Sequence, residues 1–559
     1  MKPQPPARRV NPVHSLFLAI PFATLALPVG AGPLSPTLEW SWTSSAVEPG
    51  SLNVMGTPSV MDMNGDGKPD VVFGSTASTG GGLVEVGVLR ALNGTNGTEL
   101  FTVADPSLRI NTAASVATGD IDGDKKPDII AVDSSGQRLI AFNNDGSFKW
   151  RSGILEGIYW GAPAIADLNK DGKPEIIIGR QVLRNDGTLL WTGTAGSASG
   201  GNVGPLSLVS DVNLDGKPDV VAGNTVYKAD GTIQAQNVSL PNGYNAVANF
   251  DGTPQAEIVL VADGKVWLLN HDMTVKWGPV AIPGGGYGGA PTIADFDGDG
   301  KPEIGVAGAS RYVVFETDGT VKWQTVVQDS SSNRTGSSVF DFDRDGAAEV
   351  VYGDELYLWV LDGSNGSLRF KTPKSSCTWY EYPLVADVDA DGHAEILGVA
   401  NNNCGFGSQR GVYLWGDDAN WVDTRDVWNE HTYHITNVLQ DGTIPTDEQP
   451  NWLVVGLNDF RLNQYLPGEA PLPEPASLPL FAAMLGLLAW VRARAGKQTS
   501  GRAANGLRSA LRRQAVGFAF GLRVMGVGWP VGRVRVGLLA PGTPTGARSA
   551  GEHFQEGAG

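Results

Sequence analysis

The chain has 559 residues and a formal net charge of −18, with 59 acidic residues against 41 basic ones. Residues 32–491 are more acidic than this total indicates, because residues 1–31 and 492–559 are both basic. Such an acidic body repels nucleic acid and anionic lipid, so we expect no nucleic-acid partner.

The N-terminal residues 1–31 have the pattern of a secretory signal peptide. Arg8 and Arg9 precede an apolar core at residues 16–27, and the small residues at 29–31 provide a cleavage site after Ala31. We therefore expect an exported protein. The first predicted element after the cleavage site is a strand at residues 38–42, with the sequence LEWSW.

An acidic loop of nine residues then occurs eight times. In one-letter code the copies read DMNGDGKPD, DIDGDKKPD, DLNKDGKPE, DVNLDGKPD, NFDGTPQAE, DFDGDGKPE, DFDRDGAAE and DVDADGHAE. They begin at Asp62, Asp120, Asp167, Asp211, Asn249, Asp295, Asp341 and Asp387. The mean spacing of about 46 residues is typical of a propeller or a solenoid.

The spacing within one loop predicts a calcium site. Side-chain oxygens at positions 1, 3 and 5, an acid at position 9 and the backbone carbonyl of position 7 surround one cation with hard oxygen ligands. A glycine at position 4 or 6 permits the sharp turn. Zinc would require His or Cys, magnesium prefers a tighter octahedron, and an EF-hand needs a Glu at position 12 that these loops lack.

Seven of the eight loops provide this ligand pattern. The predicted calcium ligands, taken at positions 1, 3, 5, 7 and 9, are Asp62, Asn64, Asp66, Lys68, Asp70, Asp120, Asp122, Asp124, Lys126, Asp128, Asp167, Asn169, Asp171, Lys173, Glu175, Asp211, Asn213, Asp215, Lys217, Asp219, Asp295, Asp297, Asp299, Lys301, Glu303, Asp341, Asp343, Asp345, Ala347, Glu349, Asp387, Asp389, Asp391, His393 and Glu395. The fifth loop, from Asn249 to Glu257, departs from the pattern because Asn249 replaces the first Asp and Thr253 the third ligand. We expect about seven Ca²⁺ sites and leave the fifth loop open.

Apolar runs on both sides of each loop predict two buried strands, and a second turn follows further along each repeat. Asn144-Asp145-Gly146 is one such turn, and Asp-Gly between apolar residues is a strong hairpin signal. Four strands per repeat describe one propeller blade. The loops resemble the FG-GAP or VCBS repeats of integrin alpha-chain propellers and their bacterial relatives, over residues 38–465. The resemblance implies an all-β propeller with a calcium loop between the first and second strands of each blade.

The number of blades depends on how the ring closes. Residues 38–42 match the fourth strands of other repeats, such as Lys149-Trp150, but precede the first loop. We predict that they complete the last blade after residues 412–415. Eight blades are expected, with seven as the alternative if the weak fifth unit is absorbed.

Two cysteines, Cys377 and Cys404, flank the paired strands of the last repeat. In an exported chain this number favours a disulfide, with two free thiols as the alternative. The tryptophans at blade ends are expected to pack between blades. His431 and His434 are three residues apart without an acidic ligand motif, so we expect structural roles for them and predict no catalytic residue and no organic cofactor.

The C-terminal region resembles a PEP-CTERM sorting signal. Residues 473–477 read PEPAS, residues 476–491 carry no charge, and Arg492, Arg494 and Lys497 follow. The resemblance implies processing by an exosortase in a Gram-negative bacterium after transient membrane association through residues 476–491; a simple membrane anchor is the alternative. Residues 428–437 and 458–461 resemble a stretch that closes such repeats in bacterial surface proteins.

The predicted organisation is therefore a signal peptide at 1–31, a propeller at 32–466, a Pro-rich linker at 467–475, a hydrophobic segment with a basic cluster at 476–497, and a basic low-complexity tail at 498–559. We expect a monomeric, non-enzymatic binding or adhesion module for an extracellular glycan or protein, at the cell surface or in the extracellular matrix. The alternative is a calcium-dependent polysaccharide lyase, which would require a cleft that holds an open calcium beside a Lys or Arg.

Overall fold

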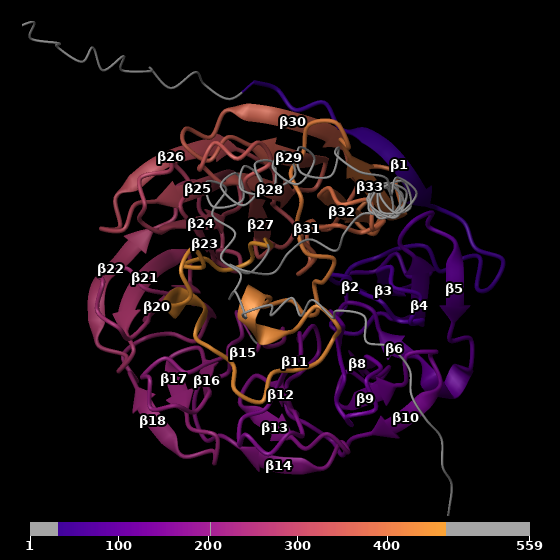
Figure 1. The fold of residues 1–559 in the computed structure, drawn as a ribbon, viewed down its shortest axis with the longest axis horizontal. Helices are drawn as coiled ribbons and strands as arrows, with labels where there is room; N and C mark the ends of the chain where they lie inside the picture. The colour runs from indigo at the N-terminus through magenta and orange to yellow at the C-terminus, as the bar shows by residue number, and fades with distance from the viewer. Residues whose placement is uncertain (1–31, 202, 465–559) are drawn as a thin grey trace, which may run out of the picture. The chain divides into compact units, whose positions relative to one another are not determined.

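The computed structural model describes residues 32–201 and 203–464, which form a ring of eight four-stranded β-sheets (Figure 1). The predicted all-β, eight-bladed propeller is confirmed. No helix of the described residues is long and apolar enough to cross a membrane. The predicted signal peptide, PEP motif, hydrophobic segment and tail all lie outside the described residues.

Each blade takes four strands in chain order, except that blade 8 receives its outermost strand from the N-terminus. Blades 1 to 4 contain β2 (Ser59–Met61), β3 (Asp70–Ser75), β4 (Val86–Asn93) and β5 (Glu99–Thr102); β7 (Ala117–Gly119), β8 (Asp128–Val132), β9 (Leu139–Phe142) and β10 (Phe148–Arg151); β11 (Ala164–Ala166), β12 (Glu175–Ile178), β13 (Gln181–Leu183) and β14 (Leu189–Thr192); and β15 (Leu208–Ser210), β16 (Asp219–Ala222), β17 (Thr225–Tyr227) and β18 (Ile233–Gln236).

Blades 5 to 8 contain β19 (Tyr244–Ala248), β20 (Glu257–Ala262), β21 (Lys265–Asn270) and β22 (Val275–Ala281); β23 (Thr292–Ala294), β24 (Glu303–Ala307), β25 (Arg311–Phe315) and β26 (Val321–Val326); β27 (Ser337–Phe340), β28 (Glu349–Gly353), β29 (Tyr357–Leu361) and β30 (Leu368–Pro373); and β31 (Leu384–Ala386), β32 (Glu395–Ala400), β33 (Gly411–Gly416) and β1 (Thr37–Trp42). The short strand β6 (Ile110–Asn111) pairs with β4 in addition. Three 3₁₀ helices cover Pro106–Leu108, Ile435–Asn437 and Asn451–Leu453.

The inner strands of the blades are buried on both faces, as their apolar runs predict. Ile176, Ile177 and Ile178 of β12 have no exposed surface, whereas no residue of β14, the outermost strand of the same blade, is buried. Complete burial of one such aliphatic side chain stabilises a protein by about 1.5–3 kcal/mol. The blades are therefore held together mainly by the apolar faces that they stack on one another.

The ring closes as the sequence predicts. Strand β1 pairs antiparallel with β33, which gives the last blade the order β1-β33-β32-β31 and places the two ends of the propeller side by side (Figure 1). The weak fifth repeat forms a full blade of its own from β19 to β22. The number of blades is therefore eight rather than seven.

A tryptophan on the outermost strand joins each of five blades to the next one. The indole Nε1–H of Trp150 donates to the backbone carbonyl of Asn185 at 2.8 Å, and its ring covers Gly187. Equivalent hydrogen bonds run from Trp40 to Gly94, from Trp191 to Ala229, from Trp277 to Thr317 and from Trp323 to Gly363. These tryptophans pack between blades, as expected.

The chain that follows blade 8 occupies the centre of the ring (Figure 1). Backbone bridges join it to the first strands of three blades: Val60 pairs with Trp428, Ile293 with Phe460, and Val339 with Leu462. The Arg461 side chain has no exposed surface and donates to the backbone carbonyls of Pro291 and His431. The segment that resembled a closing stretch therefore fills the centre of the propeller with polar and aromatic groups.

Candidate metal loops and the cleft between blades 1 and 2

Each acidic loop joins the first and second strands of a blade and is folded by its own carboxylates. In the first loop, Asp62 accepts the backbone N–H groups of Gly65 at 2.7 Å and Gly67 at 2.8 Å, and Asp66 accepts that of Lys68 at 2.9 Å. The bond from the sixth residue to the first recurs in the loops that begin at Asp120, Asp167, Asp211, Asp295, Asp341 and Asp387. The acid at position 1 therefore organises the loop backbone.

Position 4 has a positive φ in every loop, although the sequence places glycine there in only some of them. Gly65 has a φ of +77°, and Lys170, Leu214, Arg344 and Ala390 also take values between +55° and +62°. Such angles are unfavourable for residues with a Cβ. The carboxylate hydrogen bonds therefore hold the loop in one geometry even where glycine is absent.

The acid at position 9 spans the loop with one oxygen, and in three loops its other oxygen has no protein donor in the part of the chain that the structure describes. Glu175 Oε2 accepts the N–H of Leu168 at 3.0 Å, and the same bond recurs in other loops. The second oxygen is buried without a hydrogen-bond donor from the described residues in Asp70, Glu303 and Glu395. A buried carboxylate oxygen without a donor costs free energy unless a cation or proton satisfies it, so these loops fit a metal ion.

Four of the loops bring three carboxylates close enough to share one ion. Their ligand atoms lie within 4.8 Å of one another in the groups Asp120, Asp122 and Asp128; Asp295, Asp297 and Asp299; Asp341, Asp343 and Glu349; and Asp387, Asp389 and Glu395. All twelve residues belong to the predicted ligand set. Oxygen-only donors of this kind suit a hard divalent cation such as the predicted Ca²⁺.

Burial raises the pKa values of some of the most enclosed loop acids, and neighbouring acids add to the effect. Burial is the main cause for Asp70, whose pKa rises to about 7, and for Glu303, whose pKa rises to about 8. The pKa of Asp387 rises to about 7 because of burial and the nearby Asp389 and Asp391. A divalent cation would offset this repulsion and return the acids to their charged form.

Residues of the outermost strand also reach the loops, which the sequence analysis missed. Lys149 Nζ lies 2.5 Å from Asp122 and 2.8 Å from Asp128, and Lys276 Nζ lies 2.5 Å from Asp251 and 2.8 Å from Glu257. Lys322 and Arg369 pair with loop acids in blades 6 and 7. The signal was present in the sequence, because each of these residues directly precedes a Trp or Phe of the fourth strand.

The fifth loop satisfies its own polar groups. The Asn249 side-chain amide donates to the carbonyl of Thr253 at 2.6 Å, and the Thr253 hydroxyl donates to Asp251 at 2.7 Å. Lys276 neutralises Asp251 and Glu257. Lys149 makes the same contacts in the second loop, so the fifth loop differs in having Asn249 and Thr253 where the other loops have carboxylates.

A cleft of about 540 Å³ lies beside the first metal loop, between blades 1 and 2. Its lining includes Asp62 and Asn64 of the first loop, Lys125 and Lys126 of the second loop, and Asp426 and Asp441 of the central segment. A predicted calcium loop and two lysines of the next loop therefore line the same cleft. This arrangement fits an anionic ligand that is shared between a bound cation and the two ammonium groups.

The two histidines of the central segment are buried and contact the protein's own groups. His431 contacts the Tyr380 carbonyl through Nε2 at 3.1 Å, and burial lowers its pKa well below the usual range. His434 Nε2 lies 2.7 Å from Glu448 Oε1, which raises the pKa of His434 in spite of its burial. Among the described residues, neither imidazole ring forms a hydrogen bond with a cleft residue or a metal loop.

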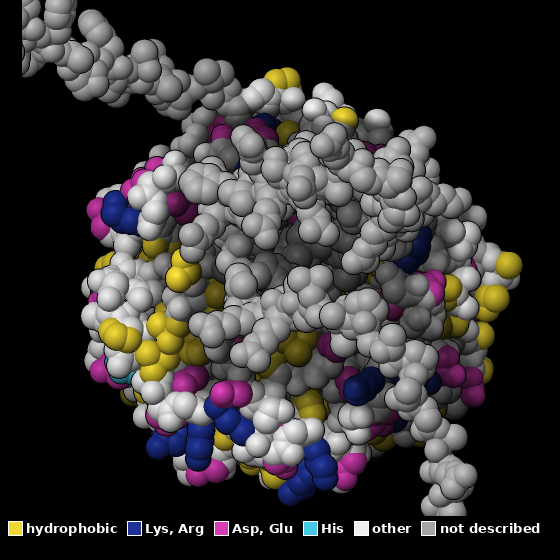
Figure 2. Space-filling view, in the orientation of Figure 1, with side chains coloured by type: hydrophobic (Ala, Val, Ile, Leu, Met, Phe, Trp, Pro, Cys, Tyr) yellow, Lys and Arg dark blue, Asp and Glu magenta, His cyan; other side chains and the backbone are white. Residues whose placement is uncertain are grey.

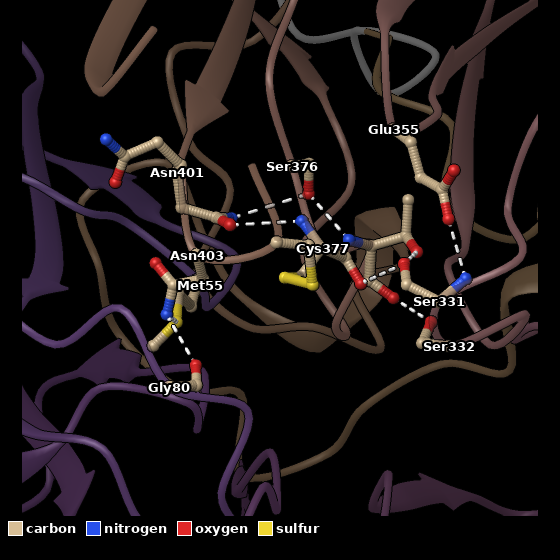
Figure 3. The surroundings of a disulfide bond; sticks show 12 residues. Met55, Gly80, Ser331, Ser332, Glu355, Ser376, Cys377, Asn401 and Asn403 are labelled. Carbon is tan, nitrogen blue, oxygen red and sulfur yellow. Dashed lines mark hydrogen bonds between the residues drawn. A yellow bond between two sulfur atoms is a disulfide. The ribbon is translucent and has the colours of Figure 1, made fainter. Parts of the chain in front are cut away.

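Cys377 and Cys404 form a disulfide bond with their Cα atoms 5.4 Å apart. Figure 3 shows how the residues around it tie neighbouring blades together. The Asn403 amide donates to the Gly80 carbonyl of blade 1 at 2.9 Å, and the Ser331 hydroxyl donates to the Cys377 carbonyl at 2.8 Å. The disulfide therefore fixes a loop of blade 8 that contacts blade 1, at the place where the first and last blades of the ring meet.

The family described as FG-GAP-like repeat matches residues 62–131, 120–178, 249–306, 295–352 and 341–398. The chain carries FG-GAP-like repeats. Each match begins at one acidic loop and ends just after the next, so it contains the three outer strands of one blade and the first strand and metal loop of the following blade. No curated protein matches the chain.

Three solved structures are similar to the chain at low sequence identity, and the first of them shares its fold. The V. cholerae biofilm matrix protein Bap1 is 21% identical, with a TM-score of 0.69 over 78% of this chain and 100% of that chain. Bacillus licheniformis rhamnogalacturonan lyase PL11 is 16% identical, with a TM-score of 0.46 over 68% of this chain and 75% of that chain. Rhamnogalacturonan lyase YesW is 15% identical, with a TM-score of 0.47 over 79% and 83%.

Proposed function

We propose that the chain is an exported, calcium-binding propeller that binds an acidic extracellular glycan without catalysis, at the cell surface or in a matrix. The observation that carries the proposal is the cleft lined by both the Asp62 loop and the lysines Lys125 and Lys126. The seven loops with the full ligand pattern would hold Ca²⁺ and keep the strand pairs rigid. The likeness to Bap1, a biofilm matrix protein, supports the fold that this role needs.

The charge distribution supports a single local site for an anion rather than a broad basic surface. On the visible part of the face in Figure 2, Lys and Arg side chains are interspersed with Asp and Glu and do not form one basic surface. An acidic protein of this kind would bind an anionic chain only where a metal ion and lysines meet. The cleft provides that combination and gives the binding its calcium dependence.

A lyase is the second candidate, and the same cleft favours it. Abstraction of a proton beside a uronate carboxylate requires a cation on the carboxylate and a nearby base, and the loop and Lys125 or Lys126 occupy those places. The other ionisable residues of the cleft, Asp426 and Asp441, carry the same sign of charge as a uronate. Binding without turnover is our first choice, because it requires only a bound cation and the two lysines.

Binding of polygalacturonate to the purified propeller tests both candidates, with neutral dextran as the control polymer. We expect binding in calcium, loss of binding in chelator, and loss in the Lys125→Gln, Lys126→Gln double variant. Lys217→Gln is the matched control, because Lys217 takes the place of Lys126 in the exposed fourth loop. Ultraviolet absorbance from an unsaturated uronate product would favour the lyase, and equal binding of dextran would contradict an acidic-glycan site.

Export is the remaining part of the proposal. We expect the surface protein to lack residues 1–31 and to end before Ser500, as the signal-peptide pattern and the PEP-CTERM resemblance imply. Mass spectrometry of the surface fraction measures both ends. Peptides from residues 500–559 on surface-located protein would instead indicate an ordinary membrane anchor with a C-terminal tail.

A further inference from the structure

The outermost strand of every blade carries a β-bulge at the same place. The extra residue, called the bulge residue below, is Leu100, Lys149, Leu190, Gln234, Lys276, Lys322, Arg369 or Glu39 in blades 1 to 8. A bulge redirects a side chain. In five blades the redirected side chain is a lysine, arginine or glutamine that contacts acids in the metal loop of its own blade.

In blade 8 the bulge residue is acidic rather than basic. Its bulge residue is Glu39, on the N-terminal strand β1, and its metal loop contains Asp387, Asp389 and Glu395. The carboxylate of Glu39 lies over Gly416, where an added Cβ would collide with Glu39 Oε1 and would lie 3.3 Å from Glu395 Cγ. The absence of a side chain at Gly416 therefore lets the two acids meet.

The oxygens at this meeting point have no protein partner among the described residues. Both carboxylate oxygens of Glu39 and the Oε1 atom of Glu395 are buried and accept no hydrogen bond. The Glu395 side chain is fully buried, and its carboxylate lies within 4.8 Å of those of Asp387 and Asp389. The described ion pairs include no Lys or Arg partner for Glu39 or Glu395. Buried acids without donors or counter-charges must bind either a cation or a proton, and three further loop acids beside them favour a cation.

We propose that a divalent cation binds between Glu39 and the eighth metal loop and thereby fastens the strand that closes the ring. The inference rests on the calcium binding assumed in the proposed function, but it adds a ligand from a different part of the chain. In blades 2, 5 and 7 a lysine or arginine of the outermost strand already pairs with the position-9 acid. Metal removal should therefore loosen β1 more than it loosens β10, β22 or β30.

Hydrogen–deuterium exchange of the intact propeller, with calcium and with chelator, measures this difference. We expect exchange in residues 37–42 to rise about tenfold on chelation, because local opening of β1 becomes easier. Residues 148–151 of β10, the matched outermost strand with Lys149 as its bulge residue, should change much less. The equivalent peptides of wild-type protein therefore serve as internal controls.

Two substitutions test the role of Glu39 directly. Glu39→Lys copies blades 2, 5 and 6, so β1 should be protected equally with and without calcium. Glu39→Gln keeps the size of the side chain and should weaken one calcium-binding step in a calorimetric titration. Lys149→Gln is the matched control and should leave the exchange of β1 unchanged.

The outcomes separate this inference from the proposed function. The inference would be overturned if chelation raised hydrogen exchange equally in β1 and β10. It would also be overturned if exchange of β1 in Glu39→Lys still depended on calcium. Neither result would contradict calcium binding at the other loops. If Glu39→Lys does not fold, unchanged calcium binding and unchanged β1 exchange in Glu39→Gln would overturn it instead. If the wild-type protein binds no calcium, both this inference and the proposed calcium-dependent function are wrong.

Discussion

Buried ionisable side chains gather where blades 6, 7 and 8 meet. Lys374 Nζ lies 3.8 Å from Glu381 Oε1, and the two side chains are 4% and 0% exposed. Burial lowers the pKa of Lys374 and raises that of Glu381. Asp329 accepts hydrogen bonds from Thr378 and from the Asn333 N–H, while its Oδ2 accepts none from the described residues. Because these side chains are buried away from water, each charged group must be stabilised by the charges and hydrogen bonds of its neighbours.

Removal of one partner from the buried pair should be costly. Lys374→Met leaves Glu381 buried without a counter-charge, and we expect it to lower the free energy of unfolding by about 3 kcal/mol. Chemical denaturation measures the change, and Lys265→Met on an exposed strand position is the control, with a change within about 0.5 kcal/mol. A Lys374→Met protein as stable as the control would show that the pair does not contribute.

Asp329 should make stability fall as the pH rises. Burial raises its pKa to about 7, against an ordinary value of 3.8 in the unfolded chain. The folded state therefore holds a proton that the unfolded state releases, so stability is lost between pH 4 and pH 7 and the full cost remains above that range. Asp329→Asn should flatten this slope relative to wild type in denaturation series at several pH values. Parallel slopes for the two proteins would contradict the assignment.

The metal loops and the tryptophan contacts are the repeated elements of this propeller. Each loop lies between two inner strands, and each of five tryptophans covers a glycine in the hairpin turn of the next blade. Gly231, for example, has a φ of +81° and packs under the ring of Trp191. One element thus stiffens a blade and the other joins neighbouring blades.

Removal of calcium should lower the melting temperature, because the loop acids would then repel one another without a counter-ion. Asp66→Ala should also lower the calcium stoichiometry by one. Thr253→Ala changes the same loop position in the fifth repeat, where positions 1 and 5 carry no carboxylate, and should change little. Equal melting temperatures in calcium and chelator would rule out a structural role for the metal.

Loss of one tryptophan contact should weaken the stacking of two blades. Trp191→Ala removes a half-buried ring and its 2.9 Å hydrogen bond to Ala229, and we expect a loss of about 2–3 kcal/mol in denaturation experiments. Trp191→Phe keeps most of the ring and should lose only about 1 kcal/mol. Val238→Ala, at a side chain that is 82% exposed, is the control.

At the scale of the whole molecule, the ring has one seam, between blades 8 and 1. Strand β1 crosses it on the outside, where Trp40 and Trp42 donate to Gly94 and Glu99 of blade 1. Strand β32 connects the eighth metal loop at its start to the loop that contains Cys404 beyond its end, and Asn403 beside this cysteine binds Gly80 of blade 1. Blades 8 and 1 are therefore held together both by strand β1 and by the loop that contains Cys404.

Deletion of residues 32–44 should open this seam. Strand β33 would become an unpaired edge with exposed backbone groups, so we expect aggregation or a large loss of stability. Deletion of residues 32–36 alone leaves β1 intact and is the matched control. Melting curves and size-exclusion chromatography measure the effect, and a shortened protein that behaves like the control would contradict closure by β1.

The sequence determined the repeated parts of this protein. The loop spacing, the apolar runs beside each loop and the Asp-Gly turns are short-range signals, and eight copies made the blade and the ring readable, including closure by residues 38–42. The sequence also marked the fifth loop as different, because Asn249 and Thr253 stand at ligand positions. These properties depend on neighbouring residues in the chain, which is why a pattern could predict them.

Only the tertiary structure decided which distant side chains meet. Lys149 and Glu39 both precede a tryptophan, but the bulge and the strand pairing place one beside Asp128 and the other beside Glu395. The burial of His431 and Arg461 likewise follows from the passage of the last segment through the centre of the ring. Contacts of this kind depend on how strands register and stack across hundreds of residues, and short-range patterns carry no information about that geometry.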